Sequence, residues 1–213
     1  MHFACRRQAE NTSLFMLYID EEPWREIHAS IFGKNPAFPS SFTSFEEFKE
    51  FKENFFEQEY IFAKRYAYKR VALKNQSSIE LSQHLAEKQV SAETIHKVIA
   101  HLSELGYCND VEWLENFIRQ QKVRKQGPAA IKAKLRAKGI PETSIASSLE
   151  EIADPEAQQA GLAALLRTRY KKHNLADFAT RQKVTAALLR KGFELSAVKA
   201  AVQAARLSQC ADS

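Results

Sequence analysis

An internal repeat constrains the fold of this chain more than any other feature of its sequence. Six positions recur with the same spacing in three segments, at offsets of 50 and then 53 residues. In each segment an apolar pair at i,i+4 marks one face of a helix, a Lys precedes the turn, and a second apolar pair marks the next helix. The three sets are Leu81, Leu85, Lys88, Val90, Ile95 and Ile99; Ile131, Leu135, Lys138, Ile140, Ile145 and Leu149; and Val184, Leu188, Lys191, Phe193, Val198 and Val202. Self-similarity at such a period is typical of arrays in which neighbouring units bury a shared core.

Each pair of helices follows a longer charged segment, at about 60–74, 110–125 and 156–173. These segments are rich in Ala, Leu, Lys, Glu, Gln and Arg, which are strong helix formers. Each unit is therefore predicted to contain three helices. In the central unit, Pro just inside a helix start and Gly just past a helix end set the limits of the second helix. The residues with predicted structural roles there are Gly127, Pro128, Ile131, Leu135, Gly139 and Ile140.

The beginning of the chain has a different composition. Residues 1–58 hold six Lys and Arg against ten Asp and Glu, and ten of the 14 Phe lie in the first 56 residues. The apolar run 14–19, a turn at 20–23 and the alternating segment 24–28 predict a two-stranded hairpin. An amphipathic helix is predicted from about 44 to 58. One face of this helix carries an aromatic stripe that is expected to be core or docking surface, made of Phe45, Phe48, Phe51 and Phe55.

These patterns predict a mainly α protein. It is an elongated tandem array of three three-helix repeats, preceded by a small β-hairpin and an amphipathic helix. The predicted boundaries are 1–58 for the N-terminal hairpin and Phe-rich helix, 59–106 and 107–153 for the first two repeats, and 154–213 for the third repeat and C-terminal tail.

Sequence motifs for catalysis and for metal binding are absent. Cys5, Cys108 and Cys210 form no C-x-x-C, the histidines form no H-E-x-x-H, and the glycines form no phosphate-binding loop. There is neither a run of roughly 18 apolar residues nor the apolar stretch of a signal peptide. We therefore expect a cytoplasmic, monomeric protein that is not an enzyme and has no cofactor, bound metal or membrane association.

Basic residues concentrate in two parts of the body. Residues 118–141 contain eight and no acid, and a second group between 167 and 191 contains only Asp177 as an acid. Like-charge pairs at i,i+4 destabilise a helix by a few tenths of a kcal/mol. Because the chain contains such pairs despite this cost, the two basic groups point to a polyanionic or acidic partner. A merely solvated face is the alternative. The candidate binding residues are Arg119, Lys122, Arg124, Lys125, Lys132, Lys134, Arg136 and Lys138, and then Arg167, Arg169, Lys171, Lys172, Arg181, Lys183, Arg190 and Lys191.

Two consecutive motifs resemble the central repeat of RecX, the family of bacterial regulators of the RecA recombinase. They are Leu105-Gly106-Tyr107-x-x-Asp110-x-x-Trp113-x-x-x-Phe117-Ile118 and Gly127-Pro128-x-x-Ile131-x-x-x-Leu135-x-x-Lys138-Gly139-Ile140. The segment Ser78-x-Glu80-Leu81-x-x-x-Leu85 is similar to the first repeat of that family, 156–206 to the third, and 17–22 to the short hairpin of some members. Two cations common in the family are missing, because this chain has Ala130 in one place and Gln76-Ser77 in the other.

The resemblance implies regulation without catalysis. RecX proteins bind in the groove of the RecA–single-stranded-DNA filament and usually suppress its ATPase, strand-exchange and coprotease activities, in the control of recombination, DNA repair and the SOS response. The expected partners are therefore this filament and single-stranded DNA, within the filament or directly and weakly. Two other functions stay open at this point: sequence-tolerant nucleic-acid binding, and a helical-repeat adaptor for an acidic protein.

Overall fold

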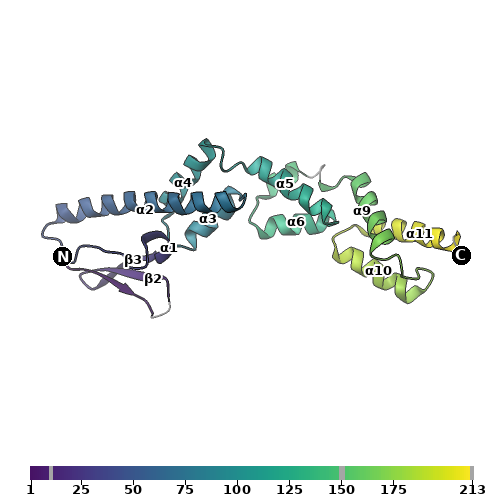
Figure 1. Ribbon diagram of the computed structural model, residues 1–213, viewed down its shortest axis with the longest axis horizontal. Helices are drawn as coiled ribbons and strands as arrows, with labels where there is room; N and C mark the ends of the chain where they lie inside the picture. Colours follow the sequence, from purple (N-terminus) through teal and green to yellow (C-terminus); the bar gives the residue numbers. More distant parts are fainter. Residues whose placement is uncertain (10–11, 149–151, 212–213) are drawn as a thin grey trace. The chain divides into compact units, whose positions relative to one another are not determined.

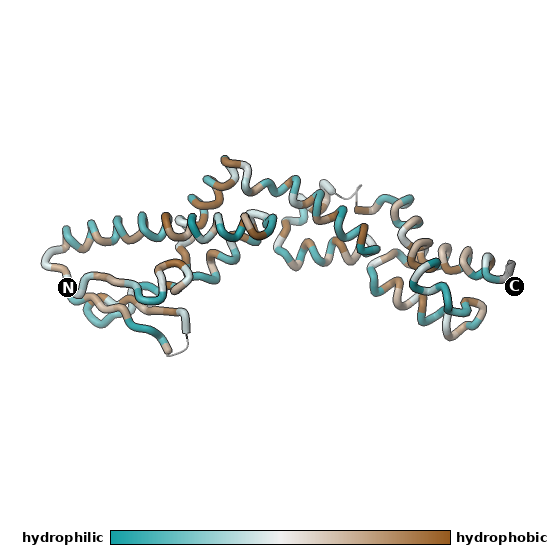
Figure 2. The backbone as a smooth tube through the Cα atoms, viewed as in Figure 1, coloured by the Kyte–Doolittle hydropathy of each residue, from teal (hydrophilic) through white to brown (hydrophobic). Residues whose placement is uncertain are grey.

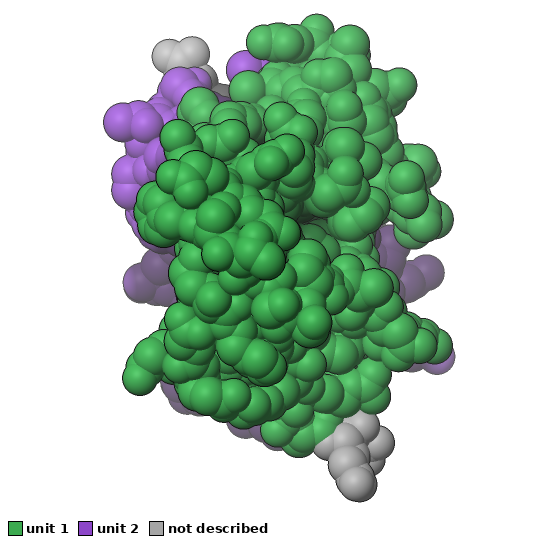
Figure 3. Space-filling view, turned by 90° about the vertical axis from the view of Figure 1, so that its left-hand side faces the viewer, with its two compact units in different colours: residues 1–110 green, residues 111–213 purple. Residues whose placement is uncertain are grey.

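Figure 1 shows the computed structural model, which describes residues 1–9, 12–148 and 152–211. The chain divides into two compact units, Met1–Asp110 and Val111–Ser213 (Figure 3). Helices dominate both units, and the first also contains a small antiparallel sheet. Hydrophobic and hydrophilic residues alternate along the helices, as amphipathic packing requires (Figure 2). The predicted class, a mainly α protein with tandem three-helix domains, is confirmed.

The N-terminal sheet has one strand more than the sequence predicted. Its order is β1 (Phe3–Arg7), β2 (Leu14–Ile19) and β3 (Glu22–His28), with both pairs antiparallel. The turn between β2 and β3 places Asp20 and Glu21 at positive φ, as a two-residue hairpin turn requires. Strand β1 was missed because Arg6 and Arg7 end it without the apolar alternation that marks the other strands.

A single helix, α2 (Phe45–Leu73), joins the sheet to the first repeat. The sequence analysis placed two helices here, at about 44–58 and 60–74, and that prediction is wrong. No Gly or Pro interrupts the segment, and Ser44 caps the helix by accepting a hydrogen bond from the Glu47 backbone N–H at 3.1 Å. The helix therefore continues through the point where the composition changes.

Aromatic residues form the core between the sheet and the first half of α2. Phe45, which was assigned to the aromatic stripe, is instead 65% exposed because it is the first residue of the helix. Phe51 is half-buried against the core. Two aliphatic residues complete this core, whose buried residues are Phe3, Phe15, Leu17, Ile27, Phe42, Phe48 and Phe55.

Three three-helix units follow, as the internal repeat predicted. In the first two units the first helix is the longest, whereas in the third unit the last helix is the longest. The first unit combines α2 with α3 (Ser78–Ala86) and α4 (Ala92–Glu104); the second contains α5 (Asp110–Val123), α6 (Pro128–Ala137) and α7 (Glu142–Ser147); the third contains α9 (Pro155–Thr168), α10 (Phe178–Arg190) and α11 (Leu195–Ala211).

The repeated spacing has a physical cause in the turn after the second helix. Gln89, Gly139 and Gly192 occupy this position with φ of 58°, 78° and 85°. In each copy the next backbone N–H reaches back to the fifth carbonyl before it, from Val90 to Leu85, from Ile140 to Leu135 and from Phe193 to Leu188. This is the hydrogen bond of a left-handed helix C-terminus, so the three units end their second helices in the same way.

The predicted core positions are mostly buried. Ile131, Leu135, Val184 and Leu188 are buried as expected, as are the equivalent Leu81 and Leu85. The third helix of the first unit differs in register, because Thr94, Val98 and Leu102 face its core while Ile95 and Ile99 are half-buried. Leu149 lies outside the described residues.

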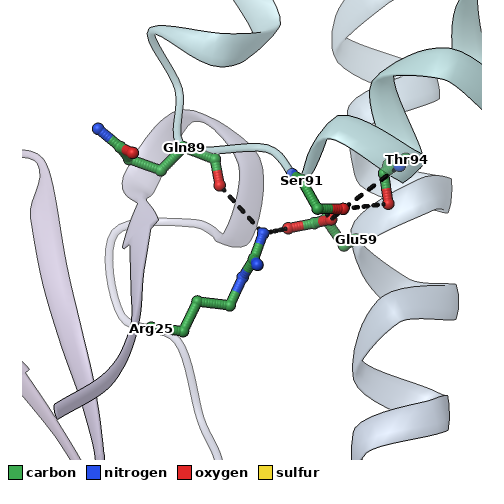
Figure 4. Close-up of polar contacts among 5 residues, drawn as sticks. All are labelled: Arg25, Glu59, Gln89, Ser91 and Thr94. Carbon is green, nitrogen blue, oxygen red and sulfur yellow. Dashed lines mark hydrogen bonds and ion pairs between the residues drawn. The ribbon is translucent and has the colours of Figure 1, made fainter.

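A buried ion pair fastens the sheet to the first repeat (Figure 4). Arg25 of β3 donates from Nη2 to Glu59 Oε1 at 2.5 Å and to the Gln89 carbonyl at 3.2 Å. The Glu59 side chain is completely buried, and its other oxygen accepts from the Ser91 backbone N–H at 3.2 Å and from the Ser91 hydroxyl at 2.5 Å. One carboxylate thus connects β3, α2 and the start of α4.

His28 makes the stability of the same region depend on pH. It caps α1 (Ala29–Phe32), because its Nδ1 accepts a hydrogen bond from the Ser30 backbone N–H at 2.9 Å. Burial, and secondarily the charge of Lys88, lower the pKa of His28. A group with a lowered folded-state pKa stabilises the fold fully above its unfolded pKa of about 6.5, and this stabilisation is lost as pH falls through the folded value.

We therefore expect the first unit to lose stability as pH falls below about 6.5. The urea midpoint of this unit, followed by Trp24 fluorescence in a Trp113→Phe background, measures the effect. In His28→Asn the amide oxygen can still cap but does not titrate, so the midpoint should decline less with falling pH. Equal declines in both proteins would contradict the role of His28.

Candidate partner-binding surface

The candidate cations all lie in the second unit. The first eight candidate residues, from Arg119 to Lys138, form what we call the central basic cluster. This cluster spans α5, the following turn and α6. The C-terminal basic cluster, Arg167 to Lys191 of the second set, spans the end of α9, the loop after it and α10. Lys122, Lys132, Lys138, Arg181 and Lys191 are half-buried. The exposed members are Arg119, Arg124, Lys125, Lys134, Arg136, Arg167, Arg169, Lys171, Lys172, Lys183 and Arg190.

Arg136 is already engaged within the chain. It pairs with Glu142, with Nη2 donating to Oε2 at 3.1 Å, and both side chains are more than half exposed. The hydrogen bond lowers the pKa of the Glu142 carboxyl and raises that of the guanidinium. The acid-free stretch counted in the sequence ends one residue before this partner. Arg136 is therefore a weaker candidate for binding than its neighbours.

Two lysines of the central basic cluster also have partners within the chain. Lys134 donates from Nζ to the side-chain oxygen of buried Gln121 at 2.8 Å. Lys138 lies over the stacked rings of Trp113 and Phe117, with its Nζ 5.8 and 5.7 Å from their centroids. These contacts fix the direction of the two charges on α6. Sequence reasoning missed both partners, because Gln121 and Trp113 lie on α5, more than ten residues away.

Arg181 has a structural role in the C-terminal basic cluster. Its Nη1 donates to the carbonyls of Leu175 and Ala176 at 2.9 and 3.1 Å, and its guanidinium lies 5.5 Å from the centroid of the Phe178 ring. These bonds close the loop before α10. The remaining exposed cations of both clusters form no ion pair with any residue in the described part of the chain.

A joint made of backbone atoms connects the second and third repeats. The N–H groups of Gly127 and Ala129, at the start of α6, donate to the carbonyls of Lys191 and Gly192 at 2.8 and 3.0 Å. Helix α6 has no side-chain cap, so the turn of the next repeat supplies the acceptors for these two N–H groups. A Cβ on Gly127 would lie 2.3 Å from the carbonyl carbon of Gly192. The joint therefore holds the two basic clusters in a fixed relation.

The described residues give no indication of catalytic or metal chemistry. Across residues 1–9, 12–148 and 152–211, no group of three or more His, Cys, Asp or Glu could hold a metal ion. Burial raises the pKa of the Cys5 and Cys108 thiols, and Asp110 adds to the effect at Cys108, so neither thiol is activated as a nucleophile. No helix in the described segments combines the length and apolar character of a membrane span.

Comparison with known proteins points to one family. Residues 109–149 match the family model described as RecX, second three-helix domain, and residues 156–202 match RecX, third three-helix domain. A regulatory protein RecX of Bacillus cytotoxicus is 32% identical over 125 residues, which are 56% of this chain and 45% of that protein. That of Bacillus velezensis is 26% identical over 201 residues, 92% of this chain and 74% of that protein.

The chain spans about half the length of the first curated relatives that it matches. A crystal structure of regulatory protein RecX has a similar fold, with a TM-score of 0.59 at 18% identity, covering 93% of this chain and 97% of the other. A RecX structure from Lactobacillus salivarius also has a TM-score of 0.59, at 22% identity, covering 70% and 97%.

Proposed function

Because the chain belongs to the RecX family, we propose that it is a non-catalytic regulator that binds the RecA–single-stranded-DNA filament and suppresses its ATPase, strand-exchange and coprotease activities. As part of this proposal, it acts in the cytoplasm as a monomer, in recombination, DNA repair and the SOS response. Single-stranded DNA is a partner within the filament and a weaker one on its own.

The surface that carries this proposal is the set of exposed cations on two rigidly joined repeats. A filament of recombinase on DNA is a polyanion with a helical repeat. A rigid body with charges on successive units can contact several of its subunits at once, which multiplies weak contacts into useful affinity. Charge alone supports any polyanionic partner, so membership of the family directs the proposal to this filament.

Inhibition follows from binding one geometry of the filament better than others. ATP hydrolysis and strand exchange require recombinase subunits to move relative to one another. A protein that bridges subunits through a stiff backbone joint stabilises one arrangement of them. Because a ligand shifts an equilibrium only by its differential affinity for the two states, the stiffness of the joint is what makes binding inhibitory.

Charge reversal in the central basic cluster tests the proposal. We expect Arg119→Glu, Arg124→Glu and Lys125→Glu together to lower affinity for the filament by about tenfold or more at modest salt, and to make its salt dependence shallower. All three side chains are exposed, so unfolding free energy should change by no more than about 1 kcal/mol. Recombinase ATPase on single-stranded DNA, titrated with each protein, measures the loss of inhibition.

The matched control reverses three exposed acids of α2, Glu46, Glu50 and Glu53, to Lys. Glu47 is excluded because its carboxylate accepts from the Thr43 backbone N–H at the helix start. The control should inhibit like the wild type. A folded basic-cluster variant that inhibits normally would show a merely solvated face. If the protein binds DNA but has no effect on the recombinase, plain nucleic-acid binding is favoured. If it neither binds DNA nor affects the recombinase, an adaptor for an acidic protein is favoured.

A further inference from the structure

A groove of about 730 Å³ lies between α10 and α11 of the third repeat. Its floor is aliphatic, because Ala186 and Leu189 of α10 meet Val202 of α11 there. Val202 is only 3% exposed, whereas Leu189 is 37% exposed, so the groove is an open apolar furrow rather than a closed cavity. Two helices therefore offer a furrow of the kind in which a third helix can lie.

The rims of this groove are cationic. Lys183 of α10 and Lys199 of α11 line it from the two helices, and both side chains are exposed. Arg181 also lines it, but its guanidinium is bound to the Leu175 and Ala176 carbonyls. The described residues along the groove include no acidic and no aromatic side chain. The two lysines are thus the charged side chains that remain available to a ligand.

We infer that this groove binds an acidic amphipathic segment of a protein partner. The aliphatic floor takes the apolar side chains of such a segment, and the lysines on the rims pair with its carboxylates. Single-stranded nucleic acid fits less well, because its bases bind to proteins largely by stacking on aromatic rings, and this floor has none. This inference rests on the proposed function in one respect, which is that the bound segment is expected to belong to the filament protein.

The binding experiment uses the full chain and a fluorescent synthetic peptide that forms a helix with Leu on one face and Glu on the other. A peptide of the same composition in scrambled order and an oligo(dT) strand are the comparison probes. We expect the wild type to bind the amphipathic peptide more tightly than the scrambled one. Ala186→Trp, which fills the groove from an exposed position without changing charge, should weaken peptide binding by about tenfold or more.

Charge reversal at the rims is the second variant. Lys183→Glu with Lys199→Glu should also weaken peptide binding by about tenfold or more, while oligo(dT) affinity stays within about threefold for Ala186→Trp. The matched control, Lys34→Glu with Lys69→Glu, makes the same charge change at exposed lysines of the first unit and should bind the peptide normally. Circular dichroism confirms that each variant is folded.

The inference is overturned if the wild type does not bind the peptide or binds the scrambled peptide equally well. It is also overturned if Ala186→Trp or the double lysine variant binds the peptide normally, or if Ala186→Trp loses as much oligo(dT) binding as peptide binding. A wild-type dimer that Ala186→Trp converts to a monomer in sedimentation would identify the occupant as a second copy, and would overturn it too. Recombinase ATPase separates this inference from the proposed function. Suppression without peptide binding leaves only the function standing, and peptide binding without suppression leaves only the inference.

Discussion

Gly127→Ala is expected to destabilise the second unit by about 3 kcal/mol, at the upper end of what overpacking usually costs. The backbone of Gly127, with φ −81° and ψ 166°, suits any residue, so the loss comes from contact rather than conformation. The new Cβ would lie 2.3 to 2.4 Å from backbone atoms of Gly192 and Phe193. Backbone atoms cannot rotate away as a side chain does, so the two repeats must separate. Urea unfolding followed by Trp113 fluorescence, in a Trp24→Phe background, measures the loss.

Two other glycines separate steric contact from backbone strain. Gly106→Ala introduces a side chain at φ +75° with no atom within 4 Å, so it should cost only about 1 to 2 kcal/mol. Gly192→Ala combines positive φ with a Cβ 2.2 Å from the Ala129–Ala130 peptide nitrogen, so it should be the most damaging of the three. A Gly127→Ala variant as stable as the wild type would show that the joint yields easily. Such a joint could not hold the basic clusters in a fixed relation.

Arg25→Met is expected to lower the stability of the first unit by about 3 to 5 kcal/mol, the usual consequence of removing one partner from a buried ion pair. The carboxylate of Glu59 would stay completely buried, with the Ser91 hydroxyl and N–H as its remaining hydrogen-bond donors. The Gln89 carbonyl would also lose a donor. Urea unfolding followed by Trp24 fluorescence, in a Trp113→Phe background, reports on this unit.

The double variant Arg25→Met with Glu59→Met tests the physical reason. Replacing both members of a buried pair with apolar residues is often nearly neutral, so the double variant should recover most of the lost stability. If it is as unstable as Arg25→Met alone, the loss comes from the aliphatic and ring contacts of Arg25 with Phe55 and Phe56, rather than from the unpaired charge.

The helical repeats were predictable because their determinants are local. Leu135 and Gly139 belong to the same turn, and the Gly127-Pro128 start of α6 and the left-handed C-terminus after Lys138 need only a few consecutive residues. The third helix of the first repeat departs from this pattern by one position, because Thr94 rather than Ile95 faces the core. Spacing predicts a helix more firmly than it predicts which face is buried.

What the sequence did not predict depends on contacts between distant residues. Strand β1 exists because the residues from Phe3 to Arg7 pair with β2, and their own pattern is ordinary. The burial of Glu59 within α2 could not be predicted, because its partner Arg25 lies on β3, 34 residues earlier in the chain. In the candidate site, sequence spacing located the cations. It could not distinguish Arg136, which pairs with Glu142, from Arg124, which forms no ion pair with the described residues, and it did not reveal the groove that Lys183 shares with Lys199.

The joint between α6 and the turn at Gly192 has a consequence for how such a protein can change over generations. Its contacts join peptide groups, which every amino acid possesses, and only a few positions must stay small. The outward faces of both repeats are thereby released from the task of holding the repeats together. Substitutions there can replace one set of charges with another while the distance between the faces is inherited unchanged. The charges on these faces can therefore change one residue at a time while the joint between the repeats stays the same.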